Sequence, residues 1–113
     1  MIIVHGIKNC DSVKKALKFL KDHEIEHSFR DFKSTPAECE EISLWLAQKD
    51  IETLFNSKSS TYRNLNLKSL NLTPQQKAQW LCKENLLIKR PIIQRNDDII
   101  VGFDINIYKA ELL

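Results

Sequence analysis

Residues 2–22, IIVHGIKNCDSVKKALKFLKD, contain the pattern that decides the fold. The β-branched run Ile2-Ile3-Val4-His5 ends at Gly6 and predicts a short buried strand. From Ser12 to Asp22, apolar side chains recur at spacings of three and four residues, while lysines occupy much of the other face. That spacing is typical of an amphipathic helix. The segment therefore predicts a strand, a turn that contains Cys10, and a helix.

The pattern on either side extends this unit. His27 to Phe32 reads as a second strand, and two strands flanking one helix form a βαβ unit with parallel strands. Near the end of the chain, Pro91–Gln94 and Ile99–Val101 are two β-branched runs separated by turn-forming residues, which predicts a hairpin. Asp104 can cap a final helix.

The middle of the chain is predicted to be helical. Thr35-Pro36-Ala37-Glu38 combines an N-cap threonine, a proline at the first helical position and a glutamate three residues after the cap, and the helix should run to Lys49. Thr73-Pro74-Gln75-Gln76 repeats this start signal. Between the two helices we expect a polar loop over Asn56–Ser60 and a short helix around Tyr62–Leu67.

The resulting order is βαβ, an inserted helical region at about 35–86, and ββα. This is the order of an α/β, thioredoxin-like fold, and a proline at the start of the third strand fits it. With 113 residues, 42% of them apolar, the chain is the right size for one domain over residues 1–113.

Charge and hydropathy exclude other classes of protein. The chain has 17 basic and 15 acidic side chains, a net charge of +2, which argues against a nucleic-acid partner. Because no apolar run approaches the roughly 20 residues of a membrane helix, we expect no membrane association. Met1 leads straight into the first strand, so we also expect no signal peptide and a cytoplasmic protein.

The three cysteines, Cys10, Cys39 and Cys82, form neither a C-x-x-C motif nor a metal-binding spacing. We therefore expect free thiols and no metal site. Cys39 and Cys82 lie on the apolar stripes of their predicted helices, where a free cysteine packs as a small hydrophobic residue.

Cys10 is the candidate for chemistry, because it precedes the start of a helix. Free N–H groups and the positive end of the helix dipole favour a thiolate there, and the thiolate is the reactive form. Lys14 and Lys15 add positive potential, while Asp11 works against it. The alternative is a small residue that merely fills the turn. Because Val13 occupies the position that would complete C-x-x-C, redox chemistry at Cys10 needs an external thiol or one of the distant cysteines.

Other residues are candidates for binding an anionic substrate. If the third strand lies beside the first, Arg90 and Pro91 lie next to Cys10, and Arg90 contributes a fixed cation; the alternative is a solvated arginine at a strand end. Asp11 and Ser12, at the start of the helix, are further candidates. Lys58 is a loop cation that, taken alone, reads as solvated.

Two motifs carry a family resemblance. Residues 6–16, GIKNCDSVKKA, together with Ile88-Lys89-Arg90-Pro91-Ile92, resemble the arsenate reductase (ArsC)/Spx family, most of all its YffB-like branch. The match spans essentially the whole chain, including Leu54–Lys58 and Thr61–Leu65. The resemblance implies a thioredoxin-like fold with a helical insertion in a bacterial cytoplasmic protein.

The same resemblance implies roles for individual residues. Cys10 matches the catalytic cysteine, Arg90 the arginine that binds the anionic substrate, and Pro91 the family's cis-proline. Lys58 lies where the family has another anion-binding arginine. A lysine there keeps the positive charge but lacks the paired N–H donors with which an arginine binds an anion.

The YffB-like branch implies a glutathione-dependent thiol reductase with Cys10 as a monothiol nucleophile. Its partners would be glutathione as co-substrate, a small thiol or oxyanion as substrate, and a glutaredoxin as a further candidate. We expect a monomer without a tightly bound cofactor.

Two alternative functions, arsenate reduction and Spx-like regulation, fit individual residues of this chain less well. Arsenate reductases keep a third arginine near the last helix, where this chain reads Val101-Gly102-Phe103-Asp104, and a histidine where this chain has Gly6. Spx-like regulators, which bind RNA polymerase, usually carry C-x-x-C at the first helix, and Val13 breaks that pattern.

Overall fold

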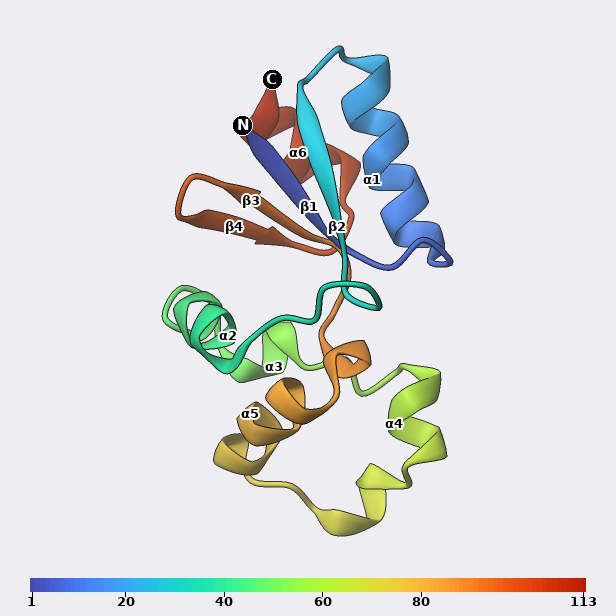
Figure 1. Cartoon of the computed structure of the whole chain (residues 1–113), viewed down its shortest axis with the longest axis vertical. Helices are drawn as coiled ribbons and strands as arrows, with labels where there is room; N and C mark the ends of the chain where they lie inside the picture. Colours follow the sequence, from blue (N-terminus) through green and yellow to red (C-terminus); the bar gives the residue numbers. More distant parts are fainter. The chain divides into compact units, whose positions relative to one another are not determined.

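The computed structural model describes residues 1–113, which divide into two compact units. The first unit consists of Met1–Asp31 and Arg90–Leu113, and the second of Phe32–Lys89. None of the helices is both long enough and apolar enough to cross a membrane. The elements labelled in Figure 1, together with the 3-10 helices η1 and η2, are β1 Ile2–Gly6, α1 Asp11–Asp22, β2 His27–Asp31, α2 Cys39–Leu46, α3 Ile51–Leu54, α4 Ser60–Asn64, η1 Leu67–Leu70, α5 Pro74–Lys83, η2 Asn85–Leu87, β3 Ile92–Arg95, β4 Asp98–Val101 and α6 Ile105–Leu112.

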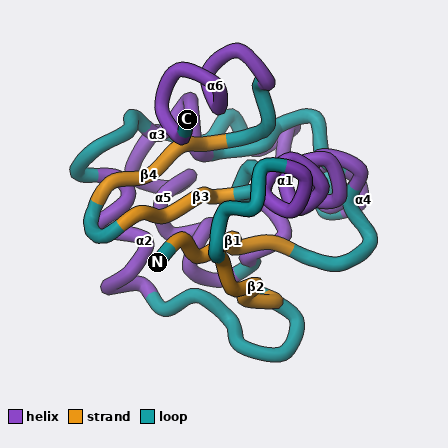
Figure 2. The backbone as a smooth tube through the Cα atoms, turned by 90° about the horizontal axis from the view of Figure 1, so that it is seen from above, coloured by secondary structure: helices purple, strands orange, loops and turns teal.

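The first unit is built on a four-stranded sheet with the strand order β2-β1-β3-β4, whose strands lie side by side in Figure 2. β1 pairs with β2 in parallel and with β3 antiparallel, and β3 and β4 form an antiparallel hairpin. The hairpin turn contains no glycine, and Asn96 adopts the left-handed conformation instead, with φ 56°. The βαβ and ββα order around this sheet is that of a thioredoxin-like fold, so the predicted fold class is confirmed.

One face of the sheet carries the core of the first unit. Ile2 and Val4 of β1 alternate onto this face, and Ile93 of β3 lies opposite Val4. Helices α1 and α6 cover the same face with the buried side chains Val13, Ala16, Phe19, Leu20 and Tyr108. The apolar residues whose spacing predicts α1 are therefore the residues that α1 buries against the sheet.

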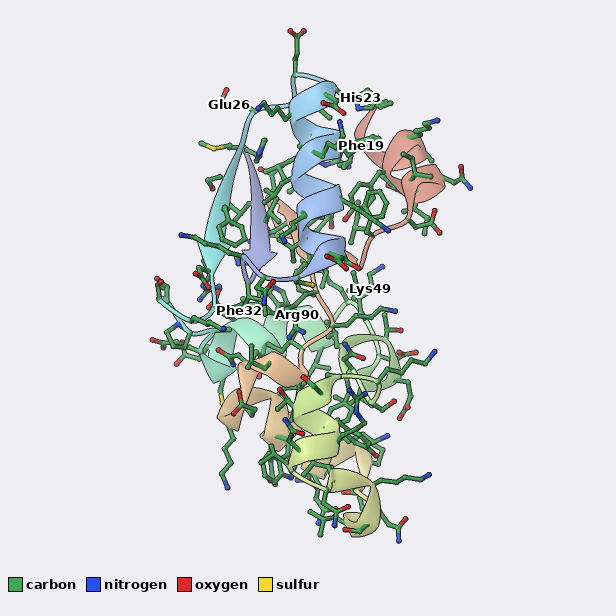
Figure 3. The ribbon with its side chains drawn as sticks, turned by 90° about the vertical axis from the view of Figure 1, so that its right-hand side faces the viewer. Phe19, His23, Glu26, Phe32, Lys49 and Arg90 are labelled. Atoms are coloured by element: carbon green, nitrogen blue, oxygen red, sulfur yellow. A yellow bond between two sulfur atoms is a disulfide. The ribbon has the colours of Figure 1, made fainter.

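Two contacts between Phe19 and His23, which lie one helical turn apart, stabilise the C-terminal end of α1. The ring of Phe19 in α1 and the ring of His23, which follows the helix directly, lie 4.2 Å apart between centroids, and both residues are labelled in Figure 3. Nδ1 of His23 also lies 2.9 Å from the carbonyl oxygen of Phe19. The same carbonyl oxygen accepts the helical hydrogen bond from His23 N–H at 3.1 Å, so the His23 ring adds a second donor at the end of α1.

A polar network joins three strands through His5, which is 3% exposed. Nη1 of Arg30 lies 2.9 Å from Nδ1 of His5, and Nε2 of His5 lies 2.8 Å from Oε1 of Gln94. Because a guanidinium only donates, Nδ1 of His5 is the acceptor and the ring proton is on Nε2. The imidazole therefore links β2, β1 and β3 and has no nitrogen left to act as a base for Cys10.

Of the two helix starts predicted for the second unit, the structure confirms only the one at Thr73. Thr73 caps α5 as predicted: its hydroxyl accepts from Gln76 N–H at 3.2 Å, and the Gln76 side chain accepts from Thr73 N–H at 2.9 Å. The predicted start at Thr35 is wrong, because α2 begins at Cys39 after a capping box formed by Glu38 and Glu41. The physical reason is a distant contact, since Ala37 N–H donates to the Asn85 side chain at 2.7 Å instead of entering a helix.

The predicted short helix between these two is displaced. α4 begins at Ser60, where the Ser59 hydroxyl accepts from Tyr62 N–H at 3.1 Å, and it ends at Asn64. Asn66 then adopts a left-handed conformation with φ 52°, which interrupts the helix before η1.

The prediction that Cys39 and Cys82 are free is wrong, because they form a disulfide. Cys39 is the exposed first residue of α2, and Cys82 is half-buried near the end of α5. Their Cα atoms are 5.1 Å apart, within the range that a disulfide spans. The apolar stripe of α2 is instead buried through Ile42 and Trp45. The pairing depends on how α2 meets α5, 43 residues apart in sequence, which helical periodicity does not reveal.

Candidate active site

Cys10 is the N-cap residue of α1, the 12-residue helix of the first unit. Its backbone is extended, with φ −145° and ψ 121°, and its carbonyl oxygen accepts the first helical bond from Lys14 N–H at 3.0 Å. The Cys10 side chain forms no capping hydrogen bond and packs half-buried against the core. It therefore lies where the first N–H groups of a helix lack intrahelical acceptors and favour an anion.

Sheet register places the start of β3 beside the end of β1. β1 and β3 pair antiparallel as far as His5 opposite Ile92. Pro91 directly precedes Ile92, the first residue of β3, and Arg90 precedes Pro91. The Arg90–Pro91 peptide bond is cis, as the family resemblance implies. The predicted placement of the third strand beside the first is thus confirmed.

Arg90 is half-buried, its Nε atom is buried, and it is labelled in Figure 3. A guanidinium stays charged over the whole accessible pH range and offers five donors in a planar fork. The first unit therefore holds a permanent cation two residues before β3, the strand next to β1.

The backbone at Pro91 is held by a chain of hydrogen bonds from the last helix. The Pro91 carbonyl oxygen accepts from Gly102 N–H at 2.8 Å, and the Gly102 carbonyl oxygen accepts from the Tyr108 hydroxyl at 2.6 Å. Gly102 has φ 83°, a conformation that favours glycine. Tyr108 is fully buried, and burial raises the pKa of its phenol, so the hydroxyl stays a donor throughout the neutral range.

Replacing Tyr108 by phenylalanine should lower the free energy of unfolding by about 1–3 kcal/mol, because the buried Gly102 carbonyl loses its partner. Urea unfolding followed by circular dichroism measures the change. Tyr62→Phe is the matched control, since Tyr62 is half-buried and its hydroxyl has no such bond. Equal stabilities of Tyr108→Phe and the wild-type protein would show that the bond contributes nothing.

The structure places the remaining predicted site residues as follows. Asp11, which is exposed, and Ser12, which is half-buried, are the first two residues of α1 and follow Cys10 directly. Lys58 is an exposed residue of the second unit, and its N–H donates to the Asn56 side chain at 3.1 Å. No group of three or more His, Cys, Asp or Glu side chains is placed to hold a metal ion.

Comparisons with known proteins identify the family. The ArsC family model matches residues 5–110. The chain belongs to the ArsC family. An uncharacterized protein of Haemophilus influenzae is 40% identical over 111 residues, which cover 97% of both chains. The regulatory protein MgsR of Bacillus subtilis is 31% identical over 103 residues, 88% of this chain and 81% of MgsR. A solved structure of a YFFB protein aligns over 100% of both chains with a TM-score of 0.91 and 28% identity.

Gly6 marks a local departure of this ArsC-family chain from the arsenate reductase pattern described above. A Cβ atom added at Gly6 would lie 2.7 Å from Cγ2 of Val13, closer than real Cβ contacts. The buried Val13 side chain in the first turn of α1 therefore lies so close to Gly6 that any side chain at position 6 would require a shift at this contact. The histidine of the arsenate reductase pattern would therefore not fit at position 6 without such a shift.

Proposed function

We propose that this ArsC-family protein is a glutathione-dependent thiol reductase that uses Cys10 as a monothiol nucleophile. The supporting observation is the state of the cysteines: Cys10 is free at the start of α1, while Cys39 and Cys82 are paired with each other. A covalent adduct on Cys10 has no free cysteine in the chain to resolve it. An external thiol is therefore needed to complete the cycle.

The reaction follows thiol–disulfide exchange in two steps. The Cys10 thiolate attacks the glutathione sulfur of a mixed disulfide, RS–SG; the S–S bond breaks, and the substrate leaves as a thiolate that takes up a proton. A second glutathione thiolate then attacks the Cys10 adduct, forming glutathione disulfide and regenerating the Cys10 thiolate. The substrate disulfide gains two electrons, which come from glutathione.

Binding of the anionic partner is assigned to the groups that favour negative charge. Arg90 would pair with a carboxylate of glutathione or an oxyanion, and the N–H groups of Asp11 and Ser12 would face the sulfur or the substrate. Lys58 stays a prediction that rests on the family resemblance. The same proposal includes a monomer without a tightly bound cofactor, a cytoplasmic location where glutathione is abundant, and a glutaredoxin as a further partner.

A coupled assay tests the proposal. The purified protein is incubated with glutathione and the mixed disulfide of glutathione and 2-mercaptoethanol, and glutathione disulfide is measured through glutathione reductase. We expect a rate proportional to protein concentration that requires both substrates. A rate no greater than the uncatalysed exchange would contradict the proposal. Arsenate in place of the mixed disulfide tests the arsenate reductase alternative, against which Gly6 and the absence of a cation in residues 101–104 count.

A regulatory role is the second candidate, and the 31% identity to the regulatory protein MgsR favours it. In this role the protein would bind RNA polymerase, as the Spx resemblance implies. Purified RNA polymerase and tagged protein are tested for a stable complex with the wild type and with Cys10→Ser. Complex formation by both proteins, without turnover in the coupled assay, would replace the reductase proposal with the regulatory one.

A further inference from the structure

Charge is segregated along the second unit. Between Glu52 and Glu84 the chain contains no aspartate or glutamate, although it has 15 acidic residues in total. The same stretch contains five cations, which are Lys58, Arg63, Lys68, Lys77 and Lys83. A net charge of +2 for the whole chain thus conceals a strongly positive segment.

Two of these five cations already have partners within the unit. Nζ of Lys77 lies 3.1 Å from Oε1 of Glu52, and Nζ of Lys83 lies 4.9 Å from the centre of the Trp80 ring. The three others, Lys58, Arg63 and Lys68, are exposed residues around α4 and η1 and form no ion pair. No carboxylate therefore forms an ion pair with any of these three side chains.

Two of these three cations, Arg63 and Lys68, line a hollow of about 300 Å³. Its lining consists of Ser57, Tyr62, Arg63, Asn66 and Lys68. Every one of these side chains carries a hydrogen-bond donor, and none is a carboxylate. Such a lining favours a ligand that presents several acceptor atoms and more than one negative charge.

Two of the lining side chains are held in place by their neighbours. Nη1 of Arg63 donates to the carbonyl oxygen of Lys58 at 3.0 Å, which orients the guanidinium and leaves its other N–H groups for a ligand. The Tyr62 ring packs edge-on against Phe55, with ring centres 5.8 Å apart and planes at 84°. The donors are thus partly positioned before any ligand arrives, which reduces the entropy cost of binding.

We propose that this hollow binds the phosphate group of a phosphate monoester. A monoester carries close to two negative charges at neutral pH and three terminal acceptor oxygens, which match one guanidinium, one ammonium and three neutral donors. A carboxylate supplies only one charge and two oxygens. The hollow lies wholly within the second unit and contains neither Cys10 nor Arg90, so the assignment is independent of the proposed reductase activity.

Titration followed by NMR tests the assignment. O-phosphoserine is added to the 15N-labelled protein, with serine as the uncharged control. We expect saturable shifts of the amide resonances of residues 57–68 with O-phosphoserine only. Arg63→Gln and Lys68→Gln should each weaken binding roughly tenfold or more, because each removes a charge-assisted hydrogen bond. Lys109→Gln, which removes an exposed lysine of α6, is the matched control and should bind as the wild type.

A phosphoserine peptide, tested beside free O-phosphoserine, distinguishes the source of the phosphate. Binding of both points to any accessible monoester, and binding of the peptide alone, with the same dependence on Arg63 and Lys68, points to a phosphorylated protein. No saturable shift with either probe, or equal affinity in Arg63→Gln and the wild type, would overturn the proposal. The coupled glutathione assay on the same Arg63→Gln preparation should be unaffected, so failure here leaves the reductase proposal standing.

Discussion

Serine in place of Cys10 should reduce turnover of the glutathione mixed disulfide by roughly a thousandfold or more. A serine hydroxyl does not ionise at neutral pH and cannot form a disulfide with glutathione, so the first step of the proposed cycle is lost. The coupled assay measures the rate. Mass spectrometry after incubation with glutathione disulfide should show one added glutathione on the wild type and none on Cys10→Ser.

Two controls make this result specific. Cys10 is only half-buried and its side chain caps nothing, so Cys10→Ser should unfold at nearly the same urea concentration as the wild type. The double variant Cys39→Ser, Cys82→Ser should keep its turnover at temperatures where it stays folded. Undiminished turnover by Cys10→Ser, or loss of turnover in the double variant while it is still folded, would contradict the monothiol mechanism.

The same double variant should lower the free energy of unfolding by about 3–4 kcal/mol. The disulfide closes a loop with a sequence separation of 43 residues, and opening it restores conformational freedom to the unfolded chain. Urea unfolding of the double variant and of the wild type measures the difference. Wild-type protein treated with a strong dithiol reductant should lose the same amount.

Counting thiols checks the pairing directly. Protein purified without reductant and then denatured should show one reactive thiol per chain, from Cys10, and three after reduction. Three reactive thiols before reduction would show that Cys39 and Cys82 are free, and the expected loss of stability would disappear with the bond.

Local patterns predict most of the first unit because its elements depend on near neighbours. The spacing of Val13, Ala16 and Leu20 predicts α1, and the burial of these residues confirms it. In the second unit, contacts between distant residues decide the outcome. Ala37 is held by Asn85, and this contact displaces the start of α2 away from the strong signal at Thr35.

In the candidate site, too, some features can be predicted from local sequence and others depend on distant contacts. Cys10 and the Arg90–Pro91 pair can be placed from sequence, because each lies at the end of a predicted strand or helix. The support of Pro91 by Gly102 and Tyr108 could not be deduced, since it joins three segments through one buried hydroxyl. In the sequence, the only indication of this contact is Gly102 just after a predicted strand and Tyr108 on the apolar stripe of the final helix.

The reactivity of the Cys10 sulfur tests the proposed mechanism most directly. The alkylation rate with iodoacetamide is measured by mass spectrometry at about pH 6.5, well below the ordinary thiol pKa of about 8.5. The start of α1 should make Cys10 react at least about tenfold faster than glutathione under the same conditions. A Cys10 that reacts no faster than glutathione would contradict its role as the nucleophile.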